Sequence, residues 1–205
     1  MNQEKYIDDL KEIKKMMNRS SRFISISGLS GISAGMSALI GVFAAHRLFF
    51  VQYPNLGFES IETAPDSLRN LLLIAVATMI VAIGTGMYFT KRETEKQNQK
   101  AWDHRTKRLL FNLAIPLFTG GIICLMFLFK GFIGLLAPLT LIFYGLGLVN
   151  ASKYTLDEIR GLGLMEIALG LIALQFTAYA LWFWAIGFGI LHIVYGIIIP
   201  MKEKS

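Results

Sequence analysis

The sequence is poor in cysteine and in charged residues. Cys124 is the one cysteine among 205 residues, so a disulfide within the chain is impossible and the paired cysteines of a zinc site are missing. Charged residues make up 17% of the chain, whereas 54% of it is hydrophobic. A soluble domain of this length could not bury so much apolar surface, but a lipid bilayer can accommodate it. The composition therefore excludes a disulfide framework and predicts an integral membrane protein.

The short motifs of common enzymes are also missing. The chain has no nucleophile elbow, no phosphate-binding loop of the Walker A type and no zinc-protease motif. His46 and His192 are predicted near opposite membrane faces, so they cannot ligate one haem. We therefore expect no catalytic residue, no metal and no cofactor, and an enzyme is the less favoured class of protein.

One group of polar residues near the predicted outer face is a candidate metal site. It consists of His46, Arg47, Gln52, Tyr53, Glu59, Glu62 and Asp66. A histidine and three carboxylates could bind a metal ion, but their spacing matches no ligand motif. Ordinary solvation of the loop at 50–68 is the favoured interpretation.

Positive charge is unevenly distributed along the chain. All but three of the 20 Lys and Arg residues fall in four segments that long apolar runs separate. The segments are 1–22, 91–108, 150–160 and 201–205. Because cytoplasmic loops carry the excess of Lys and Arg, this alternation predicts an even number of spans with both termini in the cytoplasm. The net charge of +6 then indicates anionic lipids at the cytoplasmic face, and we expect no nucleic-acid partner.

Six apolar runs are long enough to cross a bilayer. The spans are expected at about 23–49, 69–90, 109–129, 131–149, 161–179 and 183–200. Residues 1–22 are expected to carry an amphipathic helix at 4–18 on the cytoplasmic side, and 201–205 form a cytoplasmic tail. Pro116 and Pro138 lie within spans and should kink their helices. The predicted fold is an all-α integral membrane protein, a six-helix bundle built of three hairpins.

Small residues at helical spacing indicate which helix faces meet. The stripes contain Gly31 and Gly35 in the first span, Gly163 and Gly170 in the fifth, and Gly189 and Gly196 in the sixth. Such faces allow close approach of two backbones in lipid, where van der Waals contact replaces the hydrophobic driving force. Packing within the bundle is the favoured interpretation, and a seam between two copies of the chain is the alternative.

The fifth and sixth spans share a short pattern. Residues 163–172 and 189–198 both read Gly-x-x-[Glu/His]-Ile-x-x-Gly-x-Ile, at an offset of 26 residues. The second copy, within 184–200, resembles the repeated helices of six-span bacterial proteins of the HdeD acid-resistance type. The resemblance rests mainly on glycines and isoleucines. It implies a six-helix bundle built from hairpins and transfers no functional residue.

Glu166 and His192 occupy the ionisable position of this pattern. An ionisable side chain at the centre of a span is unfavourable by about 2–3 kcal/mol or more, so it indicates a functional site or a structural partner. Asn112, Asn150 and Tyr195 are expected at the same depth, near the inner leaflet. The five residues predict a polar intramembrane site. The pair could bind a proton, or it could be a hydrogen bond that holds the two spans together, which is slightly favoured.

Three functional hypotheses follow. The first is a non-enzymatic membrane protein of bacterial type in the inner (plasma) membrane, with an interaction or stress-response role. The second is a proton-linked transporter or channel for a small solute that uses Glu166 and His192. The third is an enzyme acting on lipid, with His192 as base and Glu166 as the orienting group. We rank them in this order, with the bilayer and its anionic lipids as partners and a homo-oligomer left open.

Overall fold

The structure is a computed structural model that describes residues 7, 9–10, 27–50, 65–96 and 104–203. Within these ranges the chain is helical apart from short turns, and no strand occurs. The amphipathic helix predicted at 4–18 lies outside the described residues, apart from three positions, and so does most of the loop at 50–68.

The described helices correspond in order to the apolar runs of the sequence. They are α2 (Gly28–Ala45), α3 (Pro65–Lys96), α4 (His104–Phe129), α5 (Leu136–Ala151), α6 (Asp157–Gln175), α7 (Ala180–Trp184) and α8 (His192–Glu203). Two π-helical segments, η1 (His46–Phe50) and η6 (Ala185–Leu191), extend α2 and join α7 to α8. Short 3-10 segments are η3 (Ile133–Leu135), η4 (Ser152–Tyr154) and η5 (Thr177–Tyr179).

Five of these helical stretches are long and apolar enough to cross a membrane. They are Gly28–Leu48, Leu68–Lys96, Thr106–Phe129, Ile133–Tyr154 and Thr177–Met201. The predicted fifth span corresponds to α6, which has 19 residues and contains four charged residues, Asp157, Glu158, Arg160 and Glu166. At least three of these charged residues fall in any 18-residue stretch of α6, which is more charge than the five stretches carry in their apolar parts. The protein is therefore an all-helical membrane protein in its described part.

Two predicted boundaries differ from the structure. The fourth span was expected from 131, but α5 begins at Leu136, after a turn at Gly131, whose φ of 82° suits a residue without a side chain. Pro138 consequently lies in the first turn of α5, where its missing N–H has no intrahelical partner to lose, so the expected kink does not apply. Pro116 does lie inside α4. The fifth span is shifted towards the N-terminus, because α6 covers 157–175 rather than 161–179.

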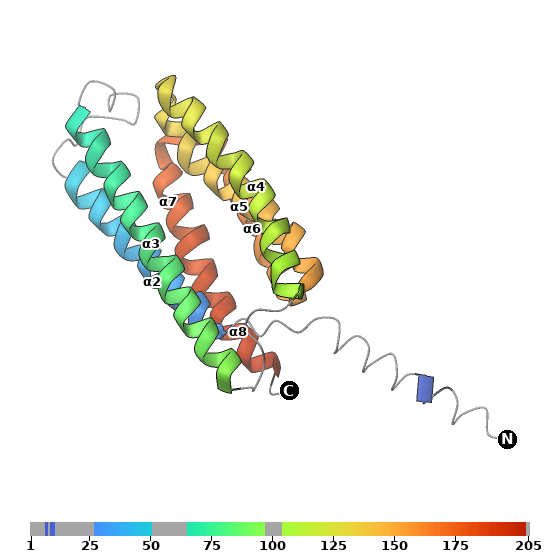
Figure 1. Cartoon of the computed structure of the whole chain (residues 1–205). Helices are drawn as coiled ribbons and strands as arrows, with labels where there is room; N and C mark the ends of the chain where they lie inside the picture. Colours follow the sequence, from blue (N-terminus) through green and yellow to red (C-terminus); the bar gives the residue numbers. More distant parts are fainter. Residues whose placement is uncertain (1–6, 8, 11–26, 51–64, 97–103, 204–205) are drawn as a thin grey trace.

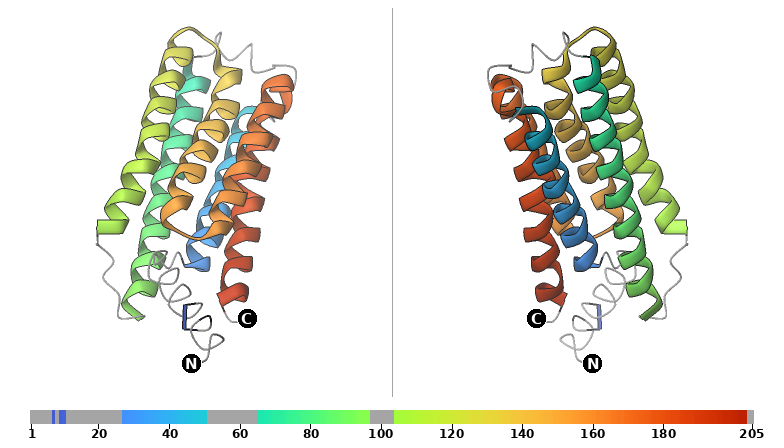
Figure 2. Two further views of the ribbon diagram at one scale, coloured as in Figure 1. Left: turned by 90° about the vertical axis from the view of Figure 1, so that its right-hand side faces the viewer. Right: turned by 90° about the vertical axis from the view of Figure 1, so that its left-hand side faces the viewer.

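The helices form two groups of three. In one group α3 packs against α2, and α2 packs against η6 and α8. In the other, α4 packs against α5, and α5 packs against α6. Figure 1 shows α2 and α3 on one side, α4, α5 and α6 on the other, and α7 and α8 between them; Figure 2 shows the same grouping from both sides. The two groups meet where α7 contacts α5 and α6, and where η6 and α8 contact α6. They also meet where Leu68 and Leu71 of α3 pack against Ile133, just before α5.

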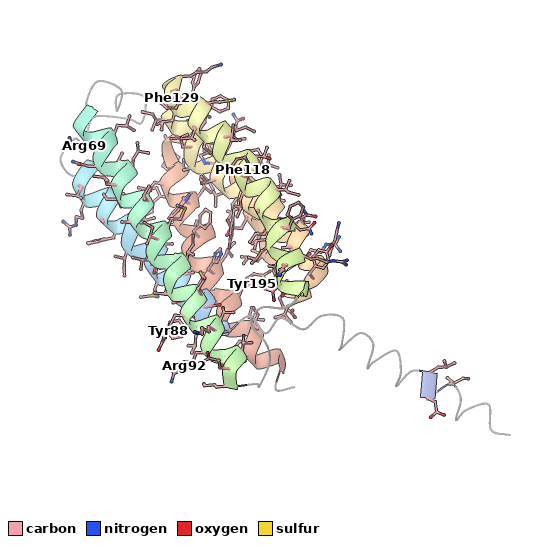
Figure 3. All side chains as sticks on the ribbon, in the orientation of Figure 1. Arg69, Tyr88, Arg92, Phe118, Phe129 and Tyr195 are labelled. Atoms are coloured by element: carbon pink, nitrogen blue, oxygen red, sulfur yellow. The ribbon has the colours of Figure 1, made fainter. Side chains whose placement is uncertain are left out.

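The outer helices expose apolar side chains. Along the most apolar part of α3, and likewise of α4, 6% of residues are buried inside the molecule. Figure 3 shows Phe118 and Phe129 projecting outward from α4 and Tyr88 projecting from α3. In water such faces would drive aggregation, whereas lipid chains can cover them. This exposure agrees with a helical protein that resides in a bilayer.

The described cations lie mostly at one end of the bundle. That end contains the C-terminus of α3 and the N-termini of α4 and α6 (Figure 1). Its cations include Lys91, Arg92, Lys107, Arg108, Lys153 and Arg160. At the opposite end are Arg47, Arg69 and Lys130; Figure 3 shows Arg69 and Arg92 at opposite ends of α3. Segments that are far apart in the sequence therefore bring their positive charges together.

Candidate functional site

Glu166 is a fully buried carboxyl group in the interior of the bundle. It is the tenth of the 19 residues of α6, and its side chain has 0% exposure. This position is at the middle of the helix rather than near its basic end, because α6 begins four residues before the predicted span. Neither carboxyl oxygen has a hydrogen-bond partner among the described residues. Glu166 is thus a buried polar group whose hydrogen-bonding capacity is unused.

His192 is the basic group beside Glu166, and the two form an ion pair when His192 is protonated. Its Nδ1 lies 3.5 Å from Glu166 Oε1, which is close for an ion pair but too long for a strong hydrogen bond. The same nitrogen lies 3.0 Å from the carbonyl oxygen of Gly187. Since a carbonyl can only accept, Nδ1 carries a hydrogen and donates it to Gly187. The hydrogen on the imidazole therefore points to the side of the ring where Glu166 lies.

Tyr144 of α5 completes the site. Its hydroxyl lies 2.8 Å from His192 Nε2, and the two rings are 5.4 Å apart between centroids. In the neutral ring, where Nδ1 carries the hydrogen, Nε2 has a free lone pair and accepts from the tyrosine hydroxyl. Tyr144 and Gly187 together select the Nδ1–H tautomer. Sequence reasoning missed Tyr144 because one tyrosine in an apolar run fits equally well facing lipid; its hydroxyl at mid-span was the available signal.

A glycine makes room for the carboxyl group. A methyl group at Gly187 would overlap Glu166 Oε2 and would come within 2.6 Å of Leu141 Cδ2. Gly187 lies in the π-helical segment η6, and π-helical turns are frequent at functional sites. The backbone amide of His192 donates to the carbonyl of Gly189, and the imidazole Nδ1–H donates to the carbonyl of Gly187. The irregular turn thus supplies both the space for Glu166 and the acceptor for His192.

Aromatic rings line the path from the site along η6 and α7. Trp184, Phe188 and His192 follow one another at four-residue spacing, with ring centroids 4.7 Å and 5.9 Å apart. Tyr144 packs against Phe188 at 4.9 Å, and Trp184 donates to Thr140 Oγ1 at 3.2 Å. Two hydrogen bonds therefore join α5, at Thr140 and Tyr144, to the continuous helical segment formed by α7, η6 and α8. The rings restrict the orientation of His192 and keep its surroundings apolar.

The other predicted polar residues lie in two different places. Asn150 Nδ2 donates to the backbone carbonyl of Asn112 at 2.9 Å and so joins α5 to α4. Asn112 Nδ2 donates within its own helix to the carbonyl of Arg108. Tyr195 lies on α8 and directs its hydroxyl to Met165 Sδ at 3.7 Å. The structure thus brings Glu166 and His192 together, whereas no described contact connects the asparagines to this pair.

The predicted outer cluster falls mostly outside the described residues. Of its members, His46 lies against Trp182, with ring centroids 5.5 Å apart, and the Arg47 guanidinium lies over the Phe43 ring at 5.3 Å. Among the described residues, no group of three or more His, Cys, Asp and Glu side chains is placed to hold a metal ion.

Comparison with known proteins identifies no relative: no family model, no curated protein and no solved structure matches the chain. The resemblance of the last two spans to the acid-resistance proteins therefore stays a prediction.

Proposed function

We propose that the chain is a non-enzymatic inner-membrane protein with six spans and both termini in the cytoplasm, and that it binds a proton at the Glu166–His192 pair. The bound proton would control how α6 packs against α8, which suits an interaction or stress-response role. In support of six spans, α6 covers about 28 Å at 1.5 Å per residue, close to the thickness of the hydrocarbon core. The gathering of cations at one end supports the orientation.

The observation that carries the proposal is the buried carboxyl group of Glu166, which has no hydrogen-bond partner among the described residues. An ionised carboxylate in an apolar interior is very unfavourable unless it is paired or hydrogen-bonded. The described surroundings provide one compensating group, the imidazole of His192. In this buried position Glu166 is stable when it holds a proton itself or when it faces a protonated His192, and the pair without that proton is the unfavourable form that higher pH produces. A proton is part of the site in both cases.

The geometry accommodates that proton in two arrangements. In the first, Glu166 is a neutral acid, and His192 donates from Nδ1 and accepts at Nε2 from Tyr144. In the second, Glu166 is ionised, and His192 carries the proton on Nε2 and donates it to the tyrosine oxygen. The change between them requires the Tyr144 hydroxyl to turn from donor to acceptor. The tyrosine thus responds to the position of the proton.

The basic end of the bundle suggests a second partner. Lys107, Lys153 and Arg160 are exposed at this end, which in the proposed orientation faces the anionic headgroups of the cytoplasmic leaflet. Binding of anionic lipid there would anchor the orientation. The lipid-active enzyme has less support, since both ring nitrogens of His192 are engaged and Glu166 is inaccessible.

Infrared difference spectroscopy of the protein in lipid nanodiscs tests the proposal. We expect a protonated-carboxyl band that changes between about pH 5 and about pH 8 and is lost in the Glu166→Gln variant. Glu93→Gln is the matched control, because it removes a glutamate at the surface end of α3. The proposal is wrong if the difference spectra of the wild type and of Glu166→Gln are the same in the carboxyl region.

A further inference from the structure

The α5–α6 seam and the α2–α8 seam are built from the same contacts. A methyl group on Gly145 of α5 would lie 2.5 Å from the carbonyl oxygen of Gly163 and 2.9 Å from the amide nitrogen of Ile167. A methyl group on Gly35 of α2 would lie 2.6 Å from the carbonyl oxygen of Gly189 and 3.1 Å from the amide nitrogen of Ile193. Each glycine thus lets one helix approach the backbone of its neighbour at the same kind of position.

A second set of contacts repeats the correspondence two turns further along. Gly170 of α6 faces the carbonyl of Pro138 and the amide of Ile142. Gly196 of α8 faces the carbonyl of Gly28 and the amide of Ile32. From α6 to α8 the matching residues are always 26 positions apart, and from α2 to α5 they are always 110 positions apart. Because both sets of glycine contacts are related by the same residue offsets, the two seams are copies of one packing arrangement.

The two copies run in opposite directions through the bundle. Figure 1 shows α6 ascending beside a descending α5, while α8 descends beside an ascending α2. The outer helices follow the same rule, since α4 ascends against α5 and α3 descends against α2. The group α4–α5–α6 therefore corresponds to the group α3–α2–α8 turned over, as a two-fold axis perpendicular to the helices would relate them. We call these groups the two halves.

The Glu166–His192 pair lies where the halves meet. The two residues occupy equivalent positions, 26 residues apart, and face each other across the junction at 3.5 Å. The symmetry is broken at one place: Tyr144, which bonds to His192, corresponds to Ala34 on α2. Alanine has no hydroxyl to offer. This difference gives a physical reason why Glu166 lacks the partner that His192 has.

The geometry points to a carrier that works by alternating access: we propose that the two halves rock about the Glu166–His192 junction, so that the pair exchanges its proton with one side of the membrane and then with the other. The halves share a packing arrangement and not a chain order, since α4, α5 and α6 correspond to α3, α2 and α8. Transporters whose halves are inverted relative to each other commonly hold an ion site where the halves meet. This inference rests on the proposed proton site. Each half moves as a unit because its glycine seam brings two backbones into contact, whereas the junction between the halves has fewer contacts between backbones.

The electrostatic surroundings of the pair are simple. Among the described residues, Tyr144 from α5 and Glu166 from α6 are the titratable groups that face His192. On the α2 side, Gly31 lies against the backbone carbonyl of His192, and the neighbouring contacts are made by the apolar Ile32 and Leu39. Binding the proton from one side forms one O–H or N–H bond at the pair, and release to the other side breaks the same bond, so the cycle leaves the protein unchanged. The step therefore needs no further reactant than the proton gradient.

Distances between spin labels at the two ends of the bundle test the inference. One pair joins the halves at one end, at Arg69 of α3 and Phe129 of α4, and a second pair joins them at the other end, at Arg92 and Lys107. All four residues are exposed, and Cys124→Ala provides a background without cysteine. Pulsed dipolar spectroscopy is carried out in nanodiscs at about pH 5 and about pH 8. A control pair within one half is at Ile40 and Met79.

Rocking predicts that one end opens by several ångströms while the other closes, with no change in the control pair. Glu166→Gln should hold both ends at distances that do not depend on pH. The inference is overturned if the two end pairs keep their distances, or change in the same sense, while the infrared carboxyl band of Glu166 responds to pH. If that band does not respond, the proposed proton site itself is wrong, so the two failures are distinguishable.

Discussion

Replacement of Glu166 by methionine separates a proton site from a structural hydrogen bond. Methionine has a similar length, and it removes both buried oxygens that lack partners. Each unsatisfied buried acceptor destabilises a fold by about 1–3 kcal/mol. The lost contact to His192 is 3.5 Å long, and a side-chain hydrogen bond within a membrane bundle contributes about 0.6 kcal/mol on average. The free energy of unfolding of Glu166→Met should therefore exceed that of the wild type by about 2 kcal/mol.

The free energy of unfolding can be measured by reversible denaturation in mixed micelles that contain an anionic detergent, with tryptophan fluorescence as the signal. We expect the unfolding midpoint of Glu166→Met to shift to more denaturant. Glu166→Gln retains two polar atoms in the same place, so its stability should stay near that of the wild type. Because a residue that lowers stability is retained for function, a stabilised variant would favour the proton site.

The opposite outcome would refute this reasoning. If Glu166→Met unfolds at a lower denaturant concentration than the wild type, the carboxyl group makes a net stabilising interaction with His192. The pair would then serve to hold α6 against α8, as the structural alternative predicts.

Three further predictions concern the tyrosine and the seams. Tyr144→Phe removes one hydrogen bond and should destabilise the protein by about 1 kcal/mol, and the ¹⁵N shifts of His192 should report a loss of the single tautomer; unchanged shifts would contradict the assignment. Gly35→Ala and Gly145→Ala each push two backbones apart and should lower stability by a similar amount, about 1–3 kcal/mol, in the same unfolding assay; a large difference between them would argue against two equivalent seams. Gly86→Ala is the control, because nothing lies within 4 Å of the added methyl group, and it should raise stability by about 0.5–1 kcal/mol.

The sequence was sufficient to locate the site but not to complete it. Glu166 and His192 stand out because charged or ionisable groups are rare within apolar runs, and the repeated pattern places them at equivalent positions. Whether they meet depends on the rotation of α6 and α8, which tertiary packing decides. The contribution of Tyr144 depends on the position of α5 in the same way. A tyrosine is as common at a lipid-facing position as in a polar site, so the sequence alone does not show which of the two Tyr144 occupies.

For the fold, too, the sequence predicted some features, and tertiary packing decided the others. The apolar runs predicted the helices. They did not predict that α5 begins only at Leu136, after the turn at Gly131, so that Pro138 lies in the first turn of the helix and does not kink it. The pattern shared by the last two spans was visible in the sequence. Its counterpart, the match of Ile32 and Gly35 with Ile142 and Gly145, involves too few residues to notice without the contacts that they share. The relation between the halves therefore needed the structure.

The number of protons that the protein takes up tests the central claim most directly. Purified wild type and Glu166→Gln, in the same nanodiscs, are taken from about pH 8 to about pH 5, and proton uptake is followed with a soluble pH indicator. The account predicts that the wild type takes up about one proton more per chain than the variant, because the Glu166–His192 pair gains a proton over this interval. Equal uptake by the two proteins would contradict a proton site at Glu166.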